Sequence, residues 1–173
     1  MEKIIHSNSY FWHAVYVKSR TEKKAQLELQ IQEIESFLPL QRKLRQWSDR
    51  QKWVEMPLIS GYLFVRASRK EYDKILQSNY VVSYVRFEGK AAIIPDHQID
   101  YLKLMLHQDN ANIEITWGKL KPGQLIEVVA GPMFGLKGTL QKMKGKNKVA
   151  VVLEQLGYSV MVEIHSEDIE VRK

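Results

Sequence analysis

The 173-residue chain contains no cysteine, which excludes disulfide bonds and zinc sites built from thiolates. It also lacks an apolar run of the roughly 20 residues that a membrane-spanning helix needs. Residues 1–13 have no apolar stretch of signal-peptide length. We therefore expect a cytoplasmic protein that makes no contact with a membrane.

The short motifs of common catalytic and metal sites are absent as well. The five histidines follow neither HExxH nor another regular ligand spacing. The GxSxG pattern of a nucleophile elbow does not occur, and the glycines from Gly131 to Gly138 lack the frame of a phosphate-binding P-loop. Because no nucleophile, base and orienting group converge, we expect a protein that is not an enzyme and uses no cofactor or metal.

Positive charge is in moderate excess. The chain has 26 Lys and Arg against 20 Asp and Glu, a net charge of +6, and a hydrophobic fraction of 45%. This balance indicates a globular protein and favours contact with nucleic acid or another acidic surface. The same excess is also compatible with a role in solubility alone.

The length allows one ordinary domain or two small ones. A polar breaker cluster, Asp109–Asn112, separates a region of alternating helical and extended patterns from a region with extended patterns only. We expect a first domain over residues 10–109, a linker over 110–118 and a second domain over 119–173.

The first domain alternates between strand and helix patterns. A capping box of Ser19 and Glu22 predicts that a helix begins near Thr21, with Leu27, Ile31 and Ile34 at helical spacing along it. The expected elements, in order, are a strand over 12–17, this helix, a strand over 37–40, an extended stretch over 53–65 broken at 60–61, a helix over 70–78, strands over 81–87 and 91–94, and a helix from Asp96. This order predicts an α+β fold in which an antiparallel sheet carries its helices on one face.

The second domain centres on the segment VVAGPMFGLKGT at residues 128–139. Gly131 and Pro132 interrupt a run of strand formers, and Gly135 and Gly138 precede the next run, as expected where a strand turns back. The alternating apolar residues that follow predict five short strands, which suit a small β-barrel. The segment KGKNK would form a hairpin tip, where lysines also discourage edge pairing.

These segments together resemble one family. The words WHAVYVKSRTEKKAQLEL, FLPLQRKLRQWSDRQKWVEMPLISGYLFV and YVVSYVRFEGKAAIIPDHQI, in this order, resemble the N-terminal (NGN) domain of NusG-type transcription elongation factors. The VVAGPMFGLKGT segment resembles the KOW motif, which forms an SH3-like barrel. The resemblance covers about residues 10–172, and the stretch LRQWSDRQKWVEMPL looks closer to the UpxY-like antiterminators of capsular polysaccharide operons than to the housekeeping factor.

Aromatic residues recur on the predicted sheet. Residues two apart in a strand share a face, so Tyr62 and Phe64 should point the same way. They could all be core, or one sheet face could be left bare for a partner. The resemblance implies that this face binds the clamp helices of the RNA polymerase β′ subunit. The candidate polymerase-binding residues are Tyr16, Tyr62, Phe64, Tyr84 and Trp12. Ser60 departs from the family, where a proline usually stands.

A basic stretch with interleaved tryptophans lies between two extended segments. It could be a solvated hairpin, or it could contact the DNA backbone with Trp47 or Trp53 stacking on an unpaired base. The resemblance places the corresponding hairpin near upstream DNA, and we also assign two residues after the first strand to the displaced non-template strand. The candidate nucleic-acid-binding residues are Lys18, Arg20, Arg42, Lys43, Arg45 and Arg50.

Pro132, Met133 and Phe134 are the candidate partner-binding residues of the KOW segment. Apolar side chains in a turn could either cover the barrel mouth or face a partner. The resemblance implies that the partner is ribosomal protein NusE or the termination factor Rho. The family commonly has phenylalanine directly after Gly-Pro, whereas Met133 holds that place here, which leaves the choice between the two partners open.

Two classes of function follow. In the first, the chain is an elongation or antitermination factor that binds RNA polymerase and recruits a second partner, either for one operon such as a polysaccharide locus or as a housekeeping factor. In the second, it is a ribosome-binding or RNA-binding KOW protein. An apolar surface on the first domain would favour the former, and converging basic and aromatic groups would favour the latter.

Overall fold

The computed structural model describes residues 9–107, 112–118, 120, 123–143 and 145–172. The chain divides into two compact units. The first comprises residues up to Leu40 together with Pro57–Asp96, and the second comprises Gln41–Met56 together with residues from His97 onward. No helix within the described residues is long and apolar enough to cross a membrane.

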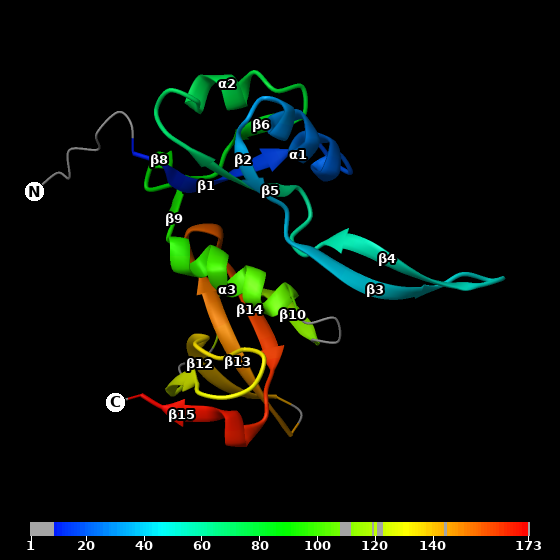
Figure 1. Cartoon of the computed structure of the whole chain (residues 1–173), viewed down its shortest axis with the longest axis vertical. Helices are drawn as coiled ribbons and strands as arrows, with labels where there is room; N and C mark the ends of the chain where they lie inside the picture. Colours follow the sequence, from blue (N-terminus) through cyan, green and yellow to red (C-terminus); the bar gives the residue numbers. More distant parts are fainter. Residues whose placement is uncertain (1–8, 108–111, 119, 121–122, 144, 173) are drawn as a thin grey trace, which may run out of the picture. The chain divides into compact units, whose positions relative to one another are not determined.

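The first unit is built on an antiparallel sheet (Figure 1). Its strand order is β2-β5-β1-β6, and β9 also pairs with β1. Its elements are β1 (Phe11–Val17), α1 (Glu22–Ile31), β2 (Glu35–Phe37), β5 (Tyr62–Ala67), α2 (Tyr72–Leu76), β6 (Val81–Tyr84), β7 (Arg86–Phe87), β8 (Lys90–Ala91) and β9 (Ile93–Ile94). The predicted mixture of an antiparallel sheet with helices is therefore confirmed.

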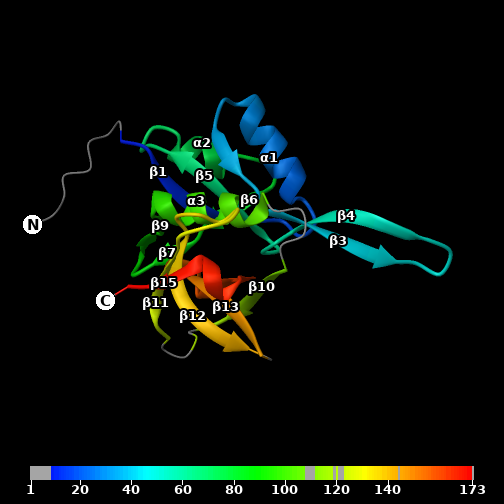
Figure 2. The ribbon, with the colours of Figure 1, turned by 60° about the horizontal axis from the view of Figure 1, so that its bottom comes forward.

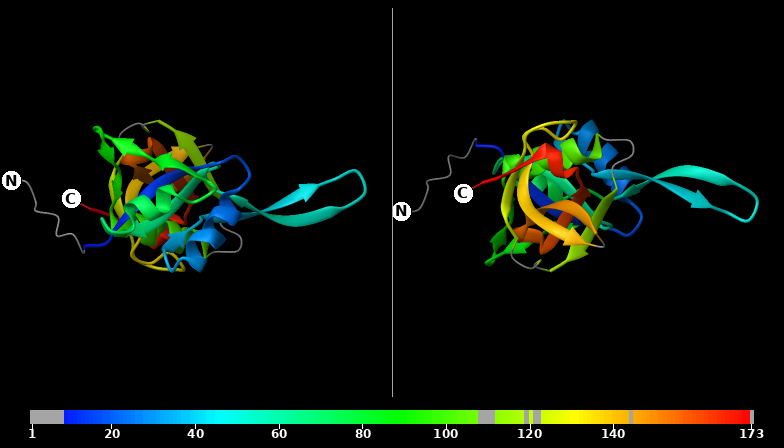
Figure 3. Two further views of the ribbon diagram at one scale, coloured as in Figure 1. Left: turned by 90° about the horizontal axis from the view of Figure 1, so that it is seen from above. Right: turned by 90° about the horizontal axis from the view of Figure 1, so that it is seen from below.

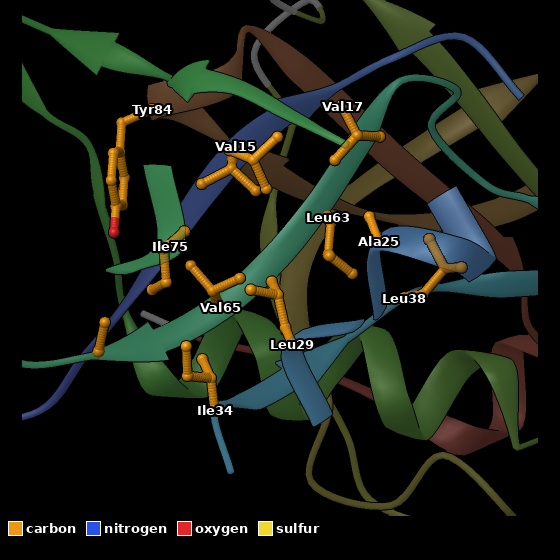
Figure 4. Close-up of a cluster of buried hydrophobic side chains, with 12 residues drawn as sticks. Val15, Val17, Ala25, Leu29, Ile34, Leu38, Leu63, Val65, Ile75 and Tyr84 are labelled. Carbon is orange, nitrogen blue, oxygen red and sulfur yellow. The ribbon is translucent and has the colours of Figure 1, made fainter. Parts of the chain in front are cut away.

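One face of this sheet forms the core with two helices (Figure 4). Val15 of β1 and Val65 of β5 pack with Leu29 of α1 and Ile75 of α2, and all four are fully buried. Helices α1 and α2 therefore cover this face, whereas α3 (Asp96–Leu106) belongs almost entirely to the second unit.

Helix α1 buries a different stripe from the one expected. Ala25 and Leu29 face the core, whereas Leu27 and Ile31 are exposed. Residues 25 and 29 are four apart and share a face, and residues 27 and 31 form a second stripe about half a turn away. The stripe that packs in the core thus includes the small Ala25. A small side chain allows the helix to pack close to the sheet.

The predicted capping box at the start of α1 is wrong. Thr21 Oγ1 donates to the Lys18 carbonyl at 2.7 Å, and Thr21 itself is the N-cap residue. The buried Glu22 carboxylate instead accepts the backbone N–H of Gly61 at 2.8 Å. Glu22 therefore ties the first turn of α1 to the turn that precedes β5, where Gly61 has φ +80°.

The second unit contains a two-stranded ribbon, a helix and a six-stranded sheet. Its elements are β3 (Leu40–Gln46), β4 (Gln51–Pro57), α3 (Asp96–Leu106), β10 (Ile113–Trp117), β11 (Leu125–Val128), β12 (Lys137–Met143), β13 (Lys146–Leu153), β14 (Tyr158–Glu163) and β15 (Ile169–Val171). The sheet order is β10-β14-β13-β12-β11-β15, with antiparallel pairing throughout. Figure 3 shows the pronounced curvature of β12.

The five expected strands are present as β11 to β15, and β10, which arises within residues 110–118, joins the same sheet by pairing with β14 along Ile113–Trp117. The sheet is open between β10 and β15, so a closed barrel is not shown. Residues 109–111 of the breaker cluster lie outside the described residues. The division into domains 10–109 and 119–173 with a linker between them stays a prediction.

Close packing at a glycine and an ion pair between a buried lysine and a partly exposed glutamate stabilise this sheet. A side chain on Gly138 would place its Cβ 2.4 Å from the Ala150 carbonyl oxygen, so the pairing of β12 with β13 requires glycine there. Lys148 is buried on β13 and lies 2.6 Å from Glu114 of β10, which links β10 to the sheet across β14. In α3, the Gln98 side chain donates to the Val152 carbonyl at 3.1 Å.

A glutamate on α1 offers a test of the first unit. Glu28 accepts hydrogen bonds from the Ser78 hydroxyl at 2.5 Å and from the backbone and side chain of Asn79 at 3.2 and 2.7 Å. The Ser78 bond is the largest cause that lowers the pKa of the Glu28 carboxyl. A lowered pKa means that the ionised carboxylate stabilises the fold above the unfolded-state value of about 4.3, and that this contribution is lost as the pH falls through the folded-state pKa.

We predict that Glu28→Ala lowers the free energy of unfolding at pH 7 by about 1–2 kcal/mol, because several hydrogen bonds to one charged group are lost. The difference from the unaltered protein should shrink towards pH 3. Urea unfolding followed by circular dichroism at both pH values measures this. Glu167→Ala, at an exposed glutamate, is the control. A difference that stays constant with pH would contradict the assignment.

Candidate functional site

The second face of the first sheet carries the aromatic residues singled out above. In the pairing of β1 with β5, Tyr16 lies opposite Tyr62 and Ala14 lies opposite Phe64. Because Val15 and its neighbours along the alternation belong to the helix-covered core, these residues and Trp12 point to the other side of the sheet.

These four side chains differ greatly in exposure. Tyr16 is 39% exposed, Tyr62 is 8% exposed, and Phe64 and Trp12 are buried. The Tyr16 and Tyr62 rings lie 4.9 Å apart with their hydroxyl oxygens at 3.4 Å, and Phe64 stacks on Phe37 with 6.1 Å between the centroids. Of the two alternatives left open for these residues, Tyr62, Phe64 and Trp12 follow the core reading, and Tyr16 alone among the four is exposed.

Tyr84 does not belong to this face. A register shift between Tyr16 and Val17 places Tyr84 opposite Val15, on the side of the core. Its ring stacks on Tyr72 of α2 with centroids 4.0 Å apart and an interplanar angle of 4°, and its hydroxyl donates to the Tyr72 carbonyl at 3.3 Å. Burial raises the pKa of the Tyr84 hydroxyl. Tyr84 therefore lies on the core side of the sheet, away from Tyr16 and Tyr62, and its assignment to a polymerase-binding surface stays a prediction.

Lys18 and Arg20 follow β1 in a tight turn, and both are exposed. The Lys18 N–H donates to the Tyr80 carbonyl at 2.9 Å, and Arg20 adopts a positive φ of 61°, which is uncommon for a residue other than glycine. The turn thus presents two cations at the end of the central strand.

The β3–β4 ribbon is the most cationic segment outside the two larger sheets. Its strands pair only with each other, and every residue from 42 to 53 is exposed. The Trp47 N–H donates to the Arg50 carbonyl at 2.8 Å across the loop, and the Gln51 side chain donates to that of Gln46. These bonds place Trp47 opposite Arg50 and Gln46 opposite Gln51. At the far end of the ribbon the Leu58 N–H donates to the Pro39 carbonyl at 2.7 Å, so the same register holds there and places Leu40 opposite Pro57.

Alternation along this register gives the ribbon two unlike faces. The cationic face, as we define it, carries Lys43, Arg45, Trp47, Arg50 and Lys52. The mixed face carries Arg42, Leu44, Trp53 and Glu55, with the Arg42 guanidinium 5.7 Å from the centre of the Trp53 ring. The structure thus brings together three of the four ribbon residues predicted to bind nucleic acid and places Arg42 on the opposite face. Figure 2 shows the ribbon.

The loop after β11 separates its two apolar side chains. The Gly135 N–H donates to the Val128 carbonyl at 2.8 Å and the Leu136 N–H donates to the Met133 carbonyl at 3.0 Å, which fixes a compact turn. Met133 is 8% exposed, whereas Phe134 is 68% exposed. Pro132 is exposed beside them. The two apolar side chains were expected either to be buried or to face a partner. Met133 is buried, and Phe134 faces solvent.

Comparison with known families settles the membership of this chain. The family described as transcription termination factor nusG matches residues 10–103, which is more than half of the sequence. The chain belongs to the NusG family. The proteins of this family are transcription factors rather than enzymes. Among the described residues, no group of three or more His, Asp or Glu side chains could hold a metal ion.

One solved structure shares the fold. A structure of Thermotoga maritima NusG, concerned with domain interaction in that protein, has 18% sequence identity and a TM-score of 0.52, covering 96% of this chain and 99% of its own. The MjSpt4:Spt5 complex in its conformation B matches at 16% identity and a TM-score of 0.33, covering 92% of this chain and 95% of that one. No curated protein sequence matches the chain.

Two features of this NusG-family chain escaped the sequence analysis. The buried Glu22 holds the Gly61 turn that precedes Tyr62, although only its helix-capping spacing was visible in the sequence. Trp47 was already named beside the basic stretch, but its place on one face of the ribbon with Lys52 and three of the predicted cations was not. The alternation of residues could have revealed the second feature once the two-residue loop was located.

Burial divides the aromatic residues into supporting and exposed positions. We predict that Phe64→Ala lowers the free energy of unfolding by about 3–5 kcal/mol, because it leaves a cavity in a fully buried site. Tyr16→Ala, at the exposed end of the same face, should cost much less. Urea denaturation of both variants provides the comparison. Equal destabilisation would show that the two residues do not differ as their burial indicates.

Proposed function

We propose that the chain is a transcription elongation and antitermination factor that binds RNA polymerase with its N-terminal domain and a second partner with its KOW domain. Membership of the NusG family is the observation that carries this proposal. The domains are those expected over residues 10–109 and 119–173, with the sheet from β11 to β15 supplying the SH3-like barrel.

The polymerase contact is assigned to the sheet face opposite α1 and α2. Tyr16 is the exposed anchor, Tyr62 supports its ring, and Phe64 and Trp12 form the base. Tyrosine suits an apolar helical partner such as the β′ clamp helices, because it combines apolar area with a hydroxyl. A partner that reaches Phe64 must displace the atoms that now cover it, and the affinity is reduced by the cost of that rearrangement.

The nucleic-acid contact is assigned to the cations that the ribbon and the turn after β1 present to solvent. Lys43, Arg45 and Arg50 lie on one face of the ribbon, and Lys18 and Arg20 follow β1. Exposed cations supply salt-sensitive affinity for phosphates, which suits upstream or non-template DNA at a transcription complex.

The KOW contact is assigned to Pro132 and Phe134. Phe134 takes the exposed role of the phenylalanine that the family commonly has directly after Gly-Pro, and Met133 packs inward instead. NusE and Rho are the candidate partners. The UpxY-like character of the ribbon sequence supports a specialised factor that promotes read-through of one operon, such as a polysaccharide locus, over a housekeeping factor.

A transcription assay with Rho present tests the function. We predict that the protein increases read-through on the leader of its own operon and that Tyr16→Ala lowers its affinity for polymerase about 30-fold, as expected when an anchor worth about 2 kcal/mol is lost. Phe87→Ala is the matched control, because Phe87 is 45% exposed and lies on the β7–β8 hairpin. Read-through on all templates would indicate a housekeeping factor, and binding to ribosomal RNA without polymerase would indicate the ribosomal class.

The KOW loop gives a second prediction. Phe134→Ala should weaken binding to NusE or Rho at least about 10-fold while leaving the melting temperature nearly unchanged, because an exposed aromatic side chain is removed. Met133→Ala should lower stability by about 2 kcal/mol or more, because its side chain is buried. Isothermal titration with each purified partner identifies which of the two binds. If Phe134→Ala bound both partners normally, the loop would not be the contact.

A further inference from the structure

We propose that the cationic face of the β3–β4 ribbon binds a single unpaired DNA strand, with Trp47 stacking on one of its bases. This inference rests on the nucleic-acid contact proposed above and specifies its form. It distinguishes one face of the ribbon from the other and an unpaired strand from a duplex.

The ribbon leaves both of its faces exposed. Its strands pair with each other, and all residues from 42 to 53 are exposed, including Leu44, Trp47 and Trp53. An isolated two-stranded hairpin is marginally stable in water, and tryptophan is usually well buried. The ribbon has seven residues in each strand and exposes two tryptophans to solvent. This exposure is therefore better explained by a binding role than by packing within the protein.

Charge selects which face meets phosphate. The cationic face carries four positive side chains and no acidic one within residues 40–57, all of which the structure describes. On the mixed face, Arg42 lies opposite Glu55 in the register and its guanidinium lies near the Trp53 ring. The remaining acid of the ribbon, Asp49, is in the loop. Phosphate oxygens therefore gain most at the cationic face.

The spacing of these cations fits one strand of nucleic acid. Neighbours on the same face of a strand are about 6.6–6.8 Å apart, and residues directly opposite have Cβ atoms about 4.5–5.5 Å apart. Arg45 lies opposite Lys52, so the two rows of cations converge on one phosphate backbone. A single phosphate backbone can therefore contact both rows at once, and Trp47 decides whether that backbone belongs to an unpaired strand.

Trp47 supplies the preference for unpaired bases. It is exposed, lies on the cationic face and stands opposite Arg50 at the loop end of the ribbon. An aromatic ring can stack on a base only when that base has left the duplex stack. We assign the strand to DNA because the contact proposed above is with upstream or non-template DNA, and RNA of the same sequence is the alternative that the test separates.

Fluorescence anisotropy of the full chain with a labelled 15-nucleotide single-stranded DNA, its RNA equivalent and the matched duplex tests the inference. The single-stranded DNA should bind more tightly than the duplex. Trp47→Ala should weaken single-stranded binding about 5-fold or more and leave duplex binding unchanged. The Arg45→Ala/Lys52→Ala variant should make the slope of log K against log salt shallower by about 1.4, since each phosphate contact to a single strand contributes about 0.7.

The control is Leu44→Ala/Trp53→Ala on the mixed face, which should bind all three probes as the unaltered protein does, and circular dichroism checks that every variant is folded. Two outcomes would overturn the inference: a duplex that binds as tightly as the single strand, or a Trp47→Ala variant with normal single-strand affinity. The wider nucleic-acid contact would still stand if the Arg45→Ala/Lys52→Ala variant weakened binding. Preferential RNA binding would overturn the assignment to DNA. If no ribbon variant had an effect, the nucleic-acid role of the ribbon would itself be wrong.

Discussion

The antiparallel pairing of β1 with β5 determines what each side of the first sheet can do. Both strands are central, and their register places Val15 and Val65 towards the helices while Tyr16 and Tyr62 meet on the other side. A shift of one residue in this pairing would exchange the two sets and remove the core. The buried Glu22 supports the register from the end, because it holds the Gly61 turn from which β5 begins.

The candidate binding residues lie beside buried partners of similar chemistry. The ring of Tyr16 contacts the ring of the buried Tyr62. The exposed Phe134 follows the buried Met133 in a turn that backbone hydrogen bonds fix. A side chain held in this way loses less conformational freedom when a partner binds. The buried member thus contributes to recognition without touching the partner, which is why substitutions at the two positions have different physical consequences.

The pattern of the sequence was informative where local rules decide the structure and uninformative where packing decides it. Alternation and turn residues located β1, β5, β6 and the compact turn at Gly131–Gly135. The bulge that turns Tyr84 into the core leaves no local signal, and neither does the choice of Ala25 and Leu29 over Leu27 and Ile31. Strand β10 was missed because its pairing partner, β14, lies more than 40 residues away along the chain. The family resemblance supplied the candidate surfaces, but the exposure of each residue required coordinates.

The ribbon illustrates how one short segment can meet two environments. Because successive side chains of a strand alternate between faces, seven residues per strand suffice to separate the cationic face from the mixed face. Neither face packs against a hydrophobic core, so the charged and aromatic residues on each face are not constrained by burial. The cost is a ribbon with little burial of its own, which a bound strand would stabilise by mass action. Order in the ribbon and occupancy of its cationic face should therefore be coupled.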